Sequence, residues 1–77
     1  MTTNDYVMIY VFKTSVKTKK AVKQLTPKLN DLLPSSHWNF DLEDCDHILR
    51  IASKIEISEK AIKLLQDNGF DCVELTD

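Results

Sequence analysis

The sequence is poor in glycine and cysteine and has nearly balanced charge, and each shortage excludes a class of protein. Gly69 is the only glycine among 77 residues, so a glycine-rich phosphate-binding loop is excluded. Two cysteines do not make a disulfide framework, and in a reducing cytosol both should be free thiols. A net charge of -2 is typical of neither a polybasic nucleic-acid binder nor a disordered acidic tail.

Long apolar runs are also missing. The longest run, YVMIYVF at residues 6–12, is far shorter than the roughly 18 residues that a membrane span needs. Met1 is followed by TTND rather than by a basic and then apolar leader, so we expect a cytoplasmic protein that makes no use of the membrane. A hydrophobic content of 43% predicts a folded chain. Because so short a chain buries only about 60% of its unfolded surface, residues 1–77 should form one domain.

The first half of the chain predicts a strand followed by a helix. Residues 6–12 are β-branched and aromatic without a polar break, as in a central strand. Over residues 16–33, the apolar side chains of Val22, Leu25, Leu29 and Leu32 recur every three or four residues, which predicts an amphipathic helix. Pro27 either kinks this helix or begins a second short one after Thr26.

The second half predicts a hairpin, a helix and a last strand. Residues 38–43 (WNFDLE) alternate apolar with polar side chains, as an edge strand does, and residues 47–52 resume an apolar run after the turn residues Asp44-Cys45-Asp46. Residues 57–65 carry a second helical stripe that should end at Asn68-Gly69. Residues 70–75 (FDCVEL) form a last short strand.

This order predicts an α+β fold, a ferredoxin-like βαββαβ sandwich in which two helices cover one face of a four-stranded antiparallel sheet. Alternation along each strand then divides the sheet residues between two faces. The helix-covered face is expected to hold Val7, Ile9, Val11, Phe40, Leu42, Leu49, Ile51, Val73 and Leu75. The open face is expected to show Tyr6, Met8, Tyr10, Phe12, Ile48 and Arg50.

Two segments resemble heavy-metal-associated domains, the family with the copper-chaperone fold. The closing NGFDCVEL is similar to that family's Gly-Tyr-Asp ending of the second helix and last strand. In the family, the loop after the first strand reads Met-Thr-Cys-x-x-Cys. Here Thr14 keeps the threonine, Lys13 replaces the methionine, and Ser15 and Thr18 stand where the two cysteines belong. The resemblance covers nearly the whole chain and implies the strand order 4-1-3-2.

The loop of Lys13, Thr14, Ser15 and Thr18 is therefore interpreted as a degenerate metal loop. Soft Cu(I) requires thiolate or thioether ligands, which neutral hydroxyls cannot replace. We expect Thr14, Ser15 or Thr18 to cap the helix instead, by accepting a hydrogen bond from a free backbone N–H. No cofactor is expected.

A relocated metal site is the alternative, and it would use Cys45, His47 and Cys72. The implied strand order separates the two cysteines by about 12 Å at about 4.8 Å per strand, and Cys45 with His47 supplies at most two of the four ligands of a structural zinc site. Catalysis is not expected, because Ser15 has no histidine nearby in the sequence and the aspartates beside His47 are typical of a turn.

Two surfaces favour binding to another protein. Six of the nine lysines lie between Lys13 and Lys28 with no acidic residue among them, and in the family that the chain resembles a basic face of the first helix docks an acidic partner. The open sheet face predicts an apolar patch of a kind that commonly marks an interface. The leading hypothesis is therefore a non-catalytic interaction module that binds a protein with an acidic surface or forms a homodimer. The interaction surface is expected to comprise Lys17, Lys19, Lys20, Lys23, Tyr6, Met8, Tyr10, Phe12 and Ile48.

Nucleic-acid binding through the lysines of residues 13–28 is a second and weaker alternative. Asn39, Asp41, Glu43 and Glu74 flank the predicted apolar patch with acidic or neutral groups, whereas phosphates require cations.

Overall fold

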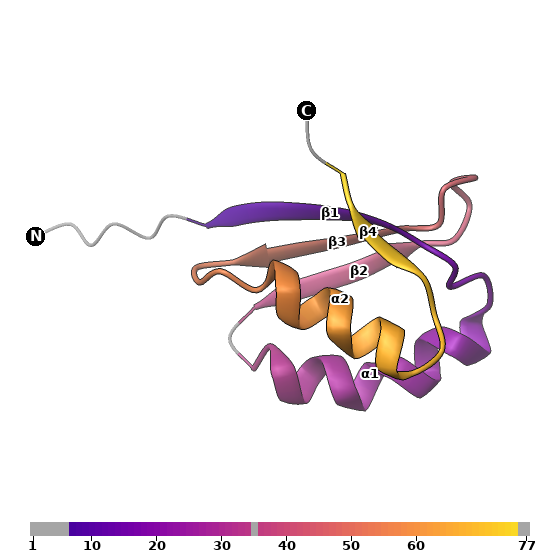
Figure 1. Cartoon of the computed structure of the whole chain (residues 1–77), viewed down its shortest axis with the longest axis horizontal. Coiled ribbons are helices and arrows are strands. Elements are labelled where there is room, and N and C mark those ends of the chain that lie inside the picture. Colours follow the sequence, from indigo (N-terminus) through magenta and orange to yellow (C-terminus); the bar gives the residue numbers. More distant parts are fainter. Residues whose placement is uncertain (1–6, 35, 76–77) are drawn as a thin grey trace, which may run out of the picture.

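Strands and helices follow one another in the predicted order in the computed structural model, which describes residues 7–34 and 36–75 (Figure 1). The α+β class is confirmed. The elements are β1 (Met8–Thr14), α1 (Lys19–Leu32), β2 (His37–Asp41), β3 (Ile48–Ser53), α2 (Ser58–Asp67) and β4 (Cys72–Glu74).

All four strands lie in one sheet in the order β2-β3-β1-β4, and every neighbouring pair is antiparallel. Both helices lie on the same side of this sheet in Figure 1, and no helix of residues 7–34 and 36–75 covers the opposite face. The arrangement is compatible with the predicted ferredoxin-like sandwich, and its strand order is the one that the sequence resemblance implied. β2 and β4 are consequently the two edge strands.

Helix α1 is continuous through Pro27, so the prediction that a second short helix begins at this proline is wrong. Thr18 is the residue that caps the helix, because its Oγ1 accepts a hydrogen bond from the backbone N–H of Ala21 at 3.1 Å. Thr26, the residue directly before the proline, donates its hydroxyl to the carbonyl of Val22 at 2.7 Å. The predicted stop of α2 is also present, since Gly69 has a φ of 87°, which glycine adopts without strain.

The core lies between the helices and the covered face of the sheet. Leu25 and Leu29 of α1 and Ala61 and Leu65 of α2 are all buried there. The other buried apolar members of this cluster are Tyr10, Phe12, Val16, Ala21, Leu33, Leu49, Ile51, Ile57 and Cys72. In the described ranges, neither helix has the length and apolar character that crossing a membrane demands.

The predicted facing of β1 is wrong. Tyr10 and Phe12 point into the core, with 6% and 0% of their surface exposed, whereas Ile9 is 63% exposed. Val7 is exposed as well and Val11 is only partly buried. Since every residue from 6 to 12 is apolar, hydrophobicity alone does not determine which alternate set is buried. Burying the aromatic set removes more apolar surface from water, which favours the observed arrangement.

The facing of β4 is reversed in the same way. Cys72 is buried at 2% exposure, and Val73 and Leu75, which were expected inside, are exposed. The pairing of Thr14 with Cys72 places both side chains on the covered face. On the other two strands the prediction holds, because Leu49 and Ile51 are buried and Phe40 and Leu42 pack against the core.

Ile48 was expected to be exposed on the open face, but only 5% of its surface is accessible. Its partners across the sheet are Lys13 and Asp41. Their side chains form ion pairs, Lys13 with Asp46 at 3.7 Å and Asp41 with Arg50 at 3.8 Å, so polar chains bracket Ile48 at this end of the sheet.

Candidate functional site

The loop between β1 and α1 uses its hydroxyl groups to hold backbone atoms. Thr18 caps α1, as one of the three predicted capping residues. Ser15 has a different role: its backbone N–H donates to the carbonyl of Asp71 at 3.1 Å, and its Oγ accepts from the N–H of Asp71 at 2.8 Å. Ser15 therefore joins the loop to the segment that leads into β4, and neither hydroxyl is unpartnered.

Thr14 connects the end of β1 to the hairpin loop between β2 and β3, residues 42–47. Its buried hydroxyl donates to the carbonyl of His47 at 2.6 Å and accepts from the N–H of Val16 at 3.1 Å. The backbone N–H of Thr14 donates to Asp46 at 3.3 Å. The two partners of this hydroxyl among the described residues are both main-chain atoms, so the geometry gives it a structural role.

The hairpin loop gathers three metal-ligand atoms, but not the three that the sequence suggested. Within the described ranges, Asp44, Cys45 and Asp46 are the group whose donor atoms all lie within 4.8 Å of one another. Two of these donors already have partners, since Asp44 Oδ1 accepts from the N–H of Asp46 at 2.9 Å and Asp46 Oδ1 pairs with Lys13. The loop is thus accounted for by turn hydrogen bonds.

Cys72 and His47 do not join Cys45 in a cluster. Cys45 is exposed on the hairpin loop, whereas Cys72 is buried under the sheet. Burial raises the pKa of the Cys72 thiol from 9.0 to about 11, so this residue is a protonated thiol at neutral pH and not the thiolate that binds metals. His47 has a φ of 49°, and its buried Nδ1 has no hydrogen-bond partner among the residues that the structure describes.

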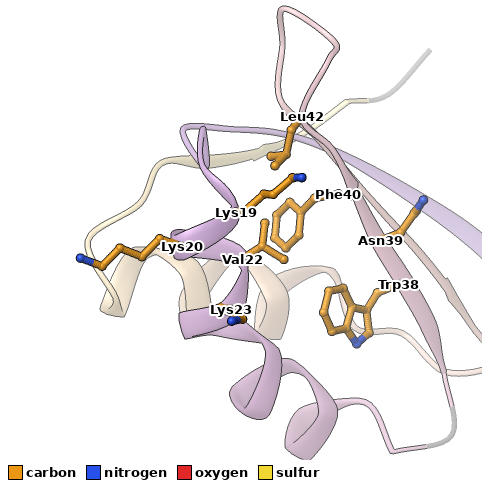
Figure 2. Close-up of a pocket in the computed structure, with 8 residues that line it drawn as sticks. All are labelled: Lys19, Lys20, Val22, Lys23, Trp38, Asn39, Phe40 and Leu42. Carbon is orange, nitrogen blue, oxygen red and sulfur yellow. The ribbon is translucent and has the colours of Figure 1, made fainter.

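A groove of about 760 Å³ lies between the first half of α1 and the edge strand β2. We call it the lysine groove (Figure 2). The residues that line it are Lys19, Lys20, Val22, Lys23, Trp38, Asn39, Phe40 and Leu42.

The floor of the lysine groove is apolar and only half-buried. Val22, Trp38, Phe40 and Leu42 are each partly exposed while packing against the core. The Trp38 and Phe40 rings meet edge to face, with centroids 5.9 Å apart and an interplanar angle of 74°. Asn30 Oδ1 accepts a hydrogen bond from Trp38 Nε1 at 3.1 Å, which fixes the indole beside α1.

Lysines form the rim of the groove. Figure 2 shows the Phe40 ring beside Lys19 and Val22, with Trp38 farther along β2 and Lys20 directed away from the ring. The first turn of α1 contains no acidic residue, although carboxylates are the side chains that a helix N-terminus favours. Lysines there add their charge to the partial positive charge of the helix end, so the rim attracts anions.

Part of this site was expected from the sequence. Lys19, Lys20 and Lys23, which were predicted to belong to the interaction surface, line the groove. Lys17 was predicted with them and is exposed, but it does not line the groove. Trp38, Phe40 and Leu42 were not expected in a site. The sequence feature that could have indicated them is a tryptophan followed by apolar residues at every second position of a predicted edge strand.

The open sheet face does carry exposed apolar side chains, but most of them are not the residues that were predicted there. Tyr10, Phe12 and Ile48 are buried, so they cannot form a surface. Met8 is exposed, and Tyr6 lies outside the described residues. The exposed apolar residues on this face belong instead to the other alternate set of β1 and β4, namely Ile9, Val73 and Leu75.

No protein-family model, no curated protein and no solved structure matches the chain. The resemblance to heavy-metal-associated domains therefore stays a prediction.

Proposed function

We propose that the protein is a non-catalytic interaction module of the cytoplasm that binds a protein partner with an acidic surface, and that the lysine groove is the binding site. One observation carries this proposal: three lysines of α1 line a groove that has a half-buried aromatic floor. A cytoplasmic location is consistent with the two free cysteines, since thiols persist in reducing compartments.

Floor and rim would contribute differently to binding. Partly exposed tryptophan and phenylalanine side chains lose apolar surface when a partner covers them, and buried tryptophans are frequent among residues whose truncation costs about 2 kcal/mol or more. Rim charges contribute less to affinity, but they steer association and exclude partners of like charge. Trp38 is therefore expected to set the strength of binding, and Lys19 with Lys23 its selectivity.

The other hypotheses have less support. A homodimer formed through this groove would bring two lysine rims together, which is repulsive. A metal carrier that uses Cys72 would depend on a thiol that is buried and protonated at neutral pH, and in the Asp44, Cys45 and Asp46 group two donors already have partners. Nucleic-acid binding through the same lysines is not favoured by a net charge of -2. In the family that the sequence resembles, a basic face of the first helix docks an acidic partner, which agrees with the proposal.

Affinity capture with charge-reversed variants tests the proposal. Tagged wild-type protein is compared with the double variant Lys19→Glu/Lys23→Glu. Lys60→Glu is the control, because Lys60 is an exposed lysine of the other helix, α2. The expected result is an acidic partner that wild type and Lys60→Glu retain equally and that the double variant loses at least about tenfold. Equal recovery by all three proteins, or recovery of no partner, would contradict the proposal.

A further inference from the structure

Among the described residues, no strand pairs with the edge of β2 that borders the lysine groove. β2 pairs with β3 alone, in an unbroken register from His37 opposite Ala52 to Asp41 opposite Ile48. Natural edge strands are commonly protected by lysine, proline, a bulge or shortness. β2 (HWNFD) contains neither lysine nor proline and has no bulge. The opposite edge, β4, has only three residues and is protected by shortness.

The side chains of the groove floor follow the repeat of a strand. Trp38, Phe40 and Leu42 lie at every second position, which separates neighbouring members by about 6.6–6.8 Å. A strand that pairs with β2 would direct every second side chain toward these residues, at the short distances of cross-strand neighbours. Residues of that strand that face Trp38 and Phe40 should therefore be apolar.

The lysine rim has a matching repeat. Lys19 and Lys23 lie four residues apart on α1, which corresponds to about 6 Å along the helix axis. In Figure 1, α1 and β2 both run along the long axis of the molecule. Carboxylates at positions i and i+2 of an added strand would be about 6.6–6.8 Å apart, so each could approach one of these lysines. The spacing of the floor residues on β2 and the spacing of the lysines on α1 therefore both fit an extended, acidic segment.

We infer that the partner binds as an additional β-strand on the edge of β2, through an extended acidic segment whose groove-facing side chains are carboxylates opposite Lys19 and Lys23 and apolar opposite Trp38 and Phe40. This inference rests on the proposed function and specifies its partner. Main-chain hydrogen bonds to β2 supply affinity that does not depend on sequence, and the groove supplies selectivity. A second copy of this chain is a poor occupant, because β2 pairing with β2 would bring two lysine rims together.

A short synthetic peptide tests the inference. The sequence DTDTVTFT places two aspartates, a valine and a phenylalanine on one face of a strand, with threonine on the other. Its reversed sequence TFTVTDTD covers the opposite strand direction. One of the two should bind wild-type protein. Binding should weaken at least about tenfold in Lys19→Glu/Lys23→Glu and stay within about twofold in Lys60→Glu.

N-methylation of the bound peptide separates strand addition from other modes of groove binding. Along a strand, amide N–H groups point alternately to its two edges. Methylating the N–H groups of one alternate set removes the hydrogen bonds to β2, and methylating the other set changes groups that face solvent. One methylated peptide should therefore lose at least about tenfold in affinity and the other less than about threefold. On the protein side, hydrogen exchange should slow at alternate amides of residues 37–41.

Each adverse outcome has a different meaning. Equal affinity of the two methylated peptides, with the lysine dependence intact, would refute strand addition and leave the proposed function standing. Failure of both peptides to bind at millimolar concentration would overturn the inference. Lysine-dependent binding to phosphatidylserine vesicles, without peptide binding, would assign the groove to a membrane surface instead. Peptide binding that is insensitive to Lys19 and Lys23 would contradict the inference and the proposed function together.

Discussion

Stability at alkaline pH should depend on the thiol of Cys72. Burial raises the pKa of this thiol from 9.0 to about 11, and only 2% of the residue is exposed. Between these two values the unfolded chain releases the proton while the folded protein keeps it. The unfolded state then binds fewer protons, so the free energy of unfolding falls as pH rises.

The size of the effect follows from the shift. One pKa unit corresponds to 1.36 kcal/mol, so the contribution of Cys72 is fully present below about pH 9. It falls by about 1.4 kcal/mol at pH 10 and by about 2–3 kcal/mol above pH 11. Tyr10 acts in the same direction, because burial, followed by Glu56 and Glu74, raises the pKa of its phenol. A variant that lacks the Cys72 thiol is therefore needed to separate its contribution from that of Tyr10.

Urea denaturation of wild type and Cys72→Ala between pH 7 and pH 11 measures this contribution. Substitution lowers stability at every pH, but the difference between the two proteins should shrink as pH rises above 9. Cys45→Ala removes the exposed thiol of the hairpin loop and should keep the pH dependence of wild type. If the difference between wild type and Cys72→Ala stayed constant up to pH 11, Cys72 would not be a protonated core residue. The argument against its use as a metal ligand would then fail.

The remaining predictions concern β1 and the loop after it. Phe12→Ala should lower the free energy of unfolding by about 3–5 kcal/mol because Phe12 is fully buried. Ile9→Thr should change it by less than about 1 kcal/mol because Ile9 is exposed. If Ile9→Thr lowered the urea midpoint more than Phe12→Ala, the observed orientation of β1, with Phe12 inside and Ile9 outside, would be contradicted. Thr14→Val should cost about 2–4 kcal/mol, since it leaves the carbonyl of His47 and the N–H of Val16 without their partner. Thr18→Ala should cost about 1 kcal/mol through loss of the helix cap. A Thr14→Val variant as stable as wild type in thermal unfolding would contradict the connecting role of that hydroxyl.

The helices and strands could be predicted from the spacing of apolar residues, because each spacing was compatible with only one type of element. Leu25 and Leu29 could face only one way on an amphipathic helix, and Asn68-Gly69 could only end a helix. Phe40 and Leu42 alternate with charged or polar residues, so their facing was also correctly predicted. Local signals were sufficient wherever polar residues marked the solvent side.

The facing of β1 could not be predicted, because both alternate sets of its residues are apolar. The choice between Ile9 and Tyr10 depends on the helices that pack beneath them, and on Thr14, whose buried hydroxyl must bond to a distant carbonyl. Neither contact is local in the sequence. The same reasoning applies to β4, where the pairing of Cys72 with Thr14 places Cys72 inside.

Only the lysines of the candidate site could be predicted, because the contacts that form the rest of it are not local in the sequence. Lys19 and Lys23 were identified because a cluster of like charges is visible along the chain. Trp38 and Phe40 were missed as site residues, because their proximity to those lysines arises only when α1 packs beside the edge strand. The spacing of apolar residues on a strand does not by itself separate a core face from a groove floor.

Fluorescence of Trp38 tests the central claim most directly. It is the only tryptophan of the chain and lies on the floor of the lysine groove, so its emission reports occupancy of the groove itself. On titration with the acidic peptide, we expect a saturable blue shift as the indole is covered. Binding should weaken as salt shortens the range of electrostatic interactions, and Lys19→Glu/Lys23→Glu should raise the midpoint of the titration at least about tenfold. An emission spectrum that the peptide leaves unchanged, or a shift of equal midpoint in the double variant, would contradict the assignment of this groove as the binding site.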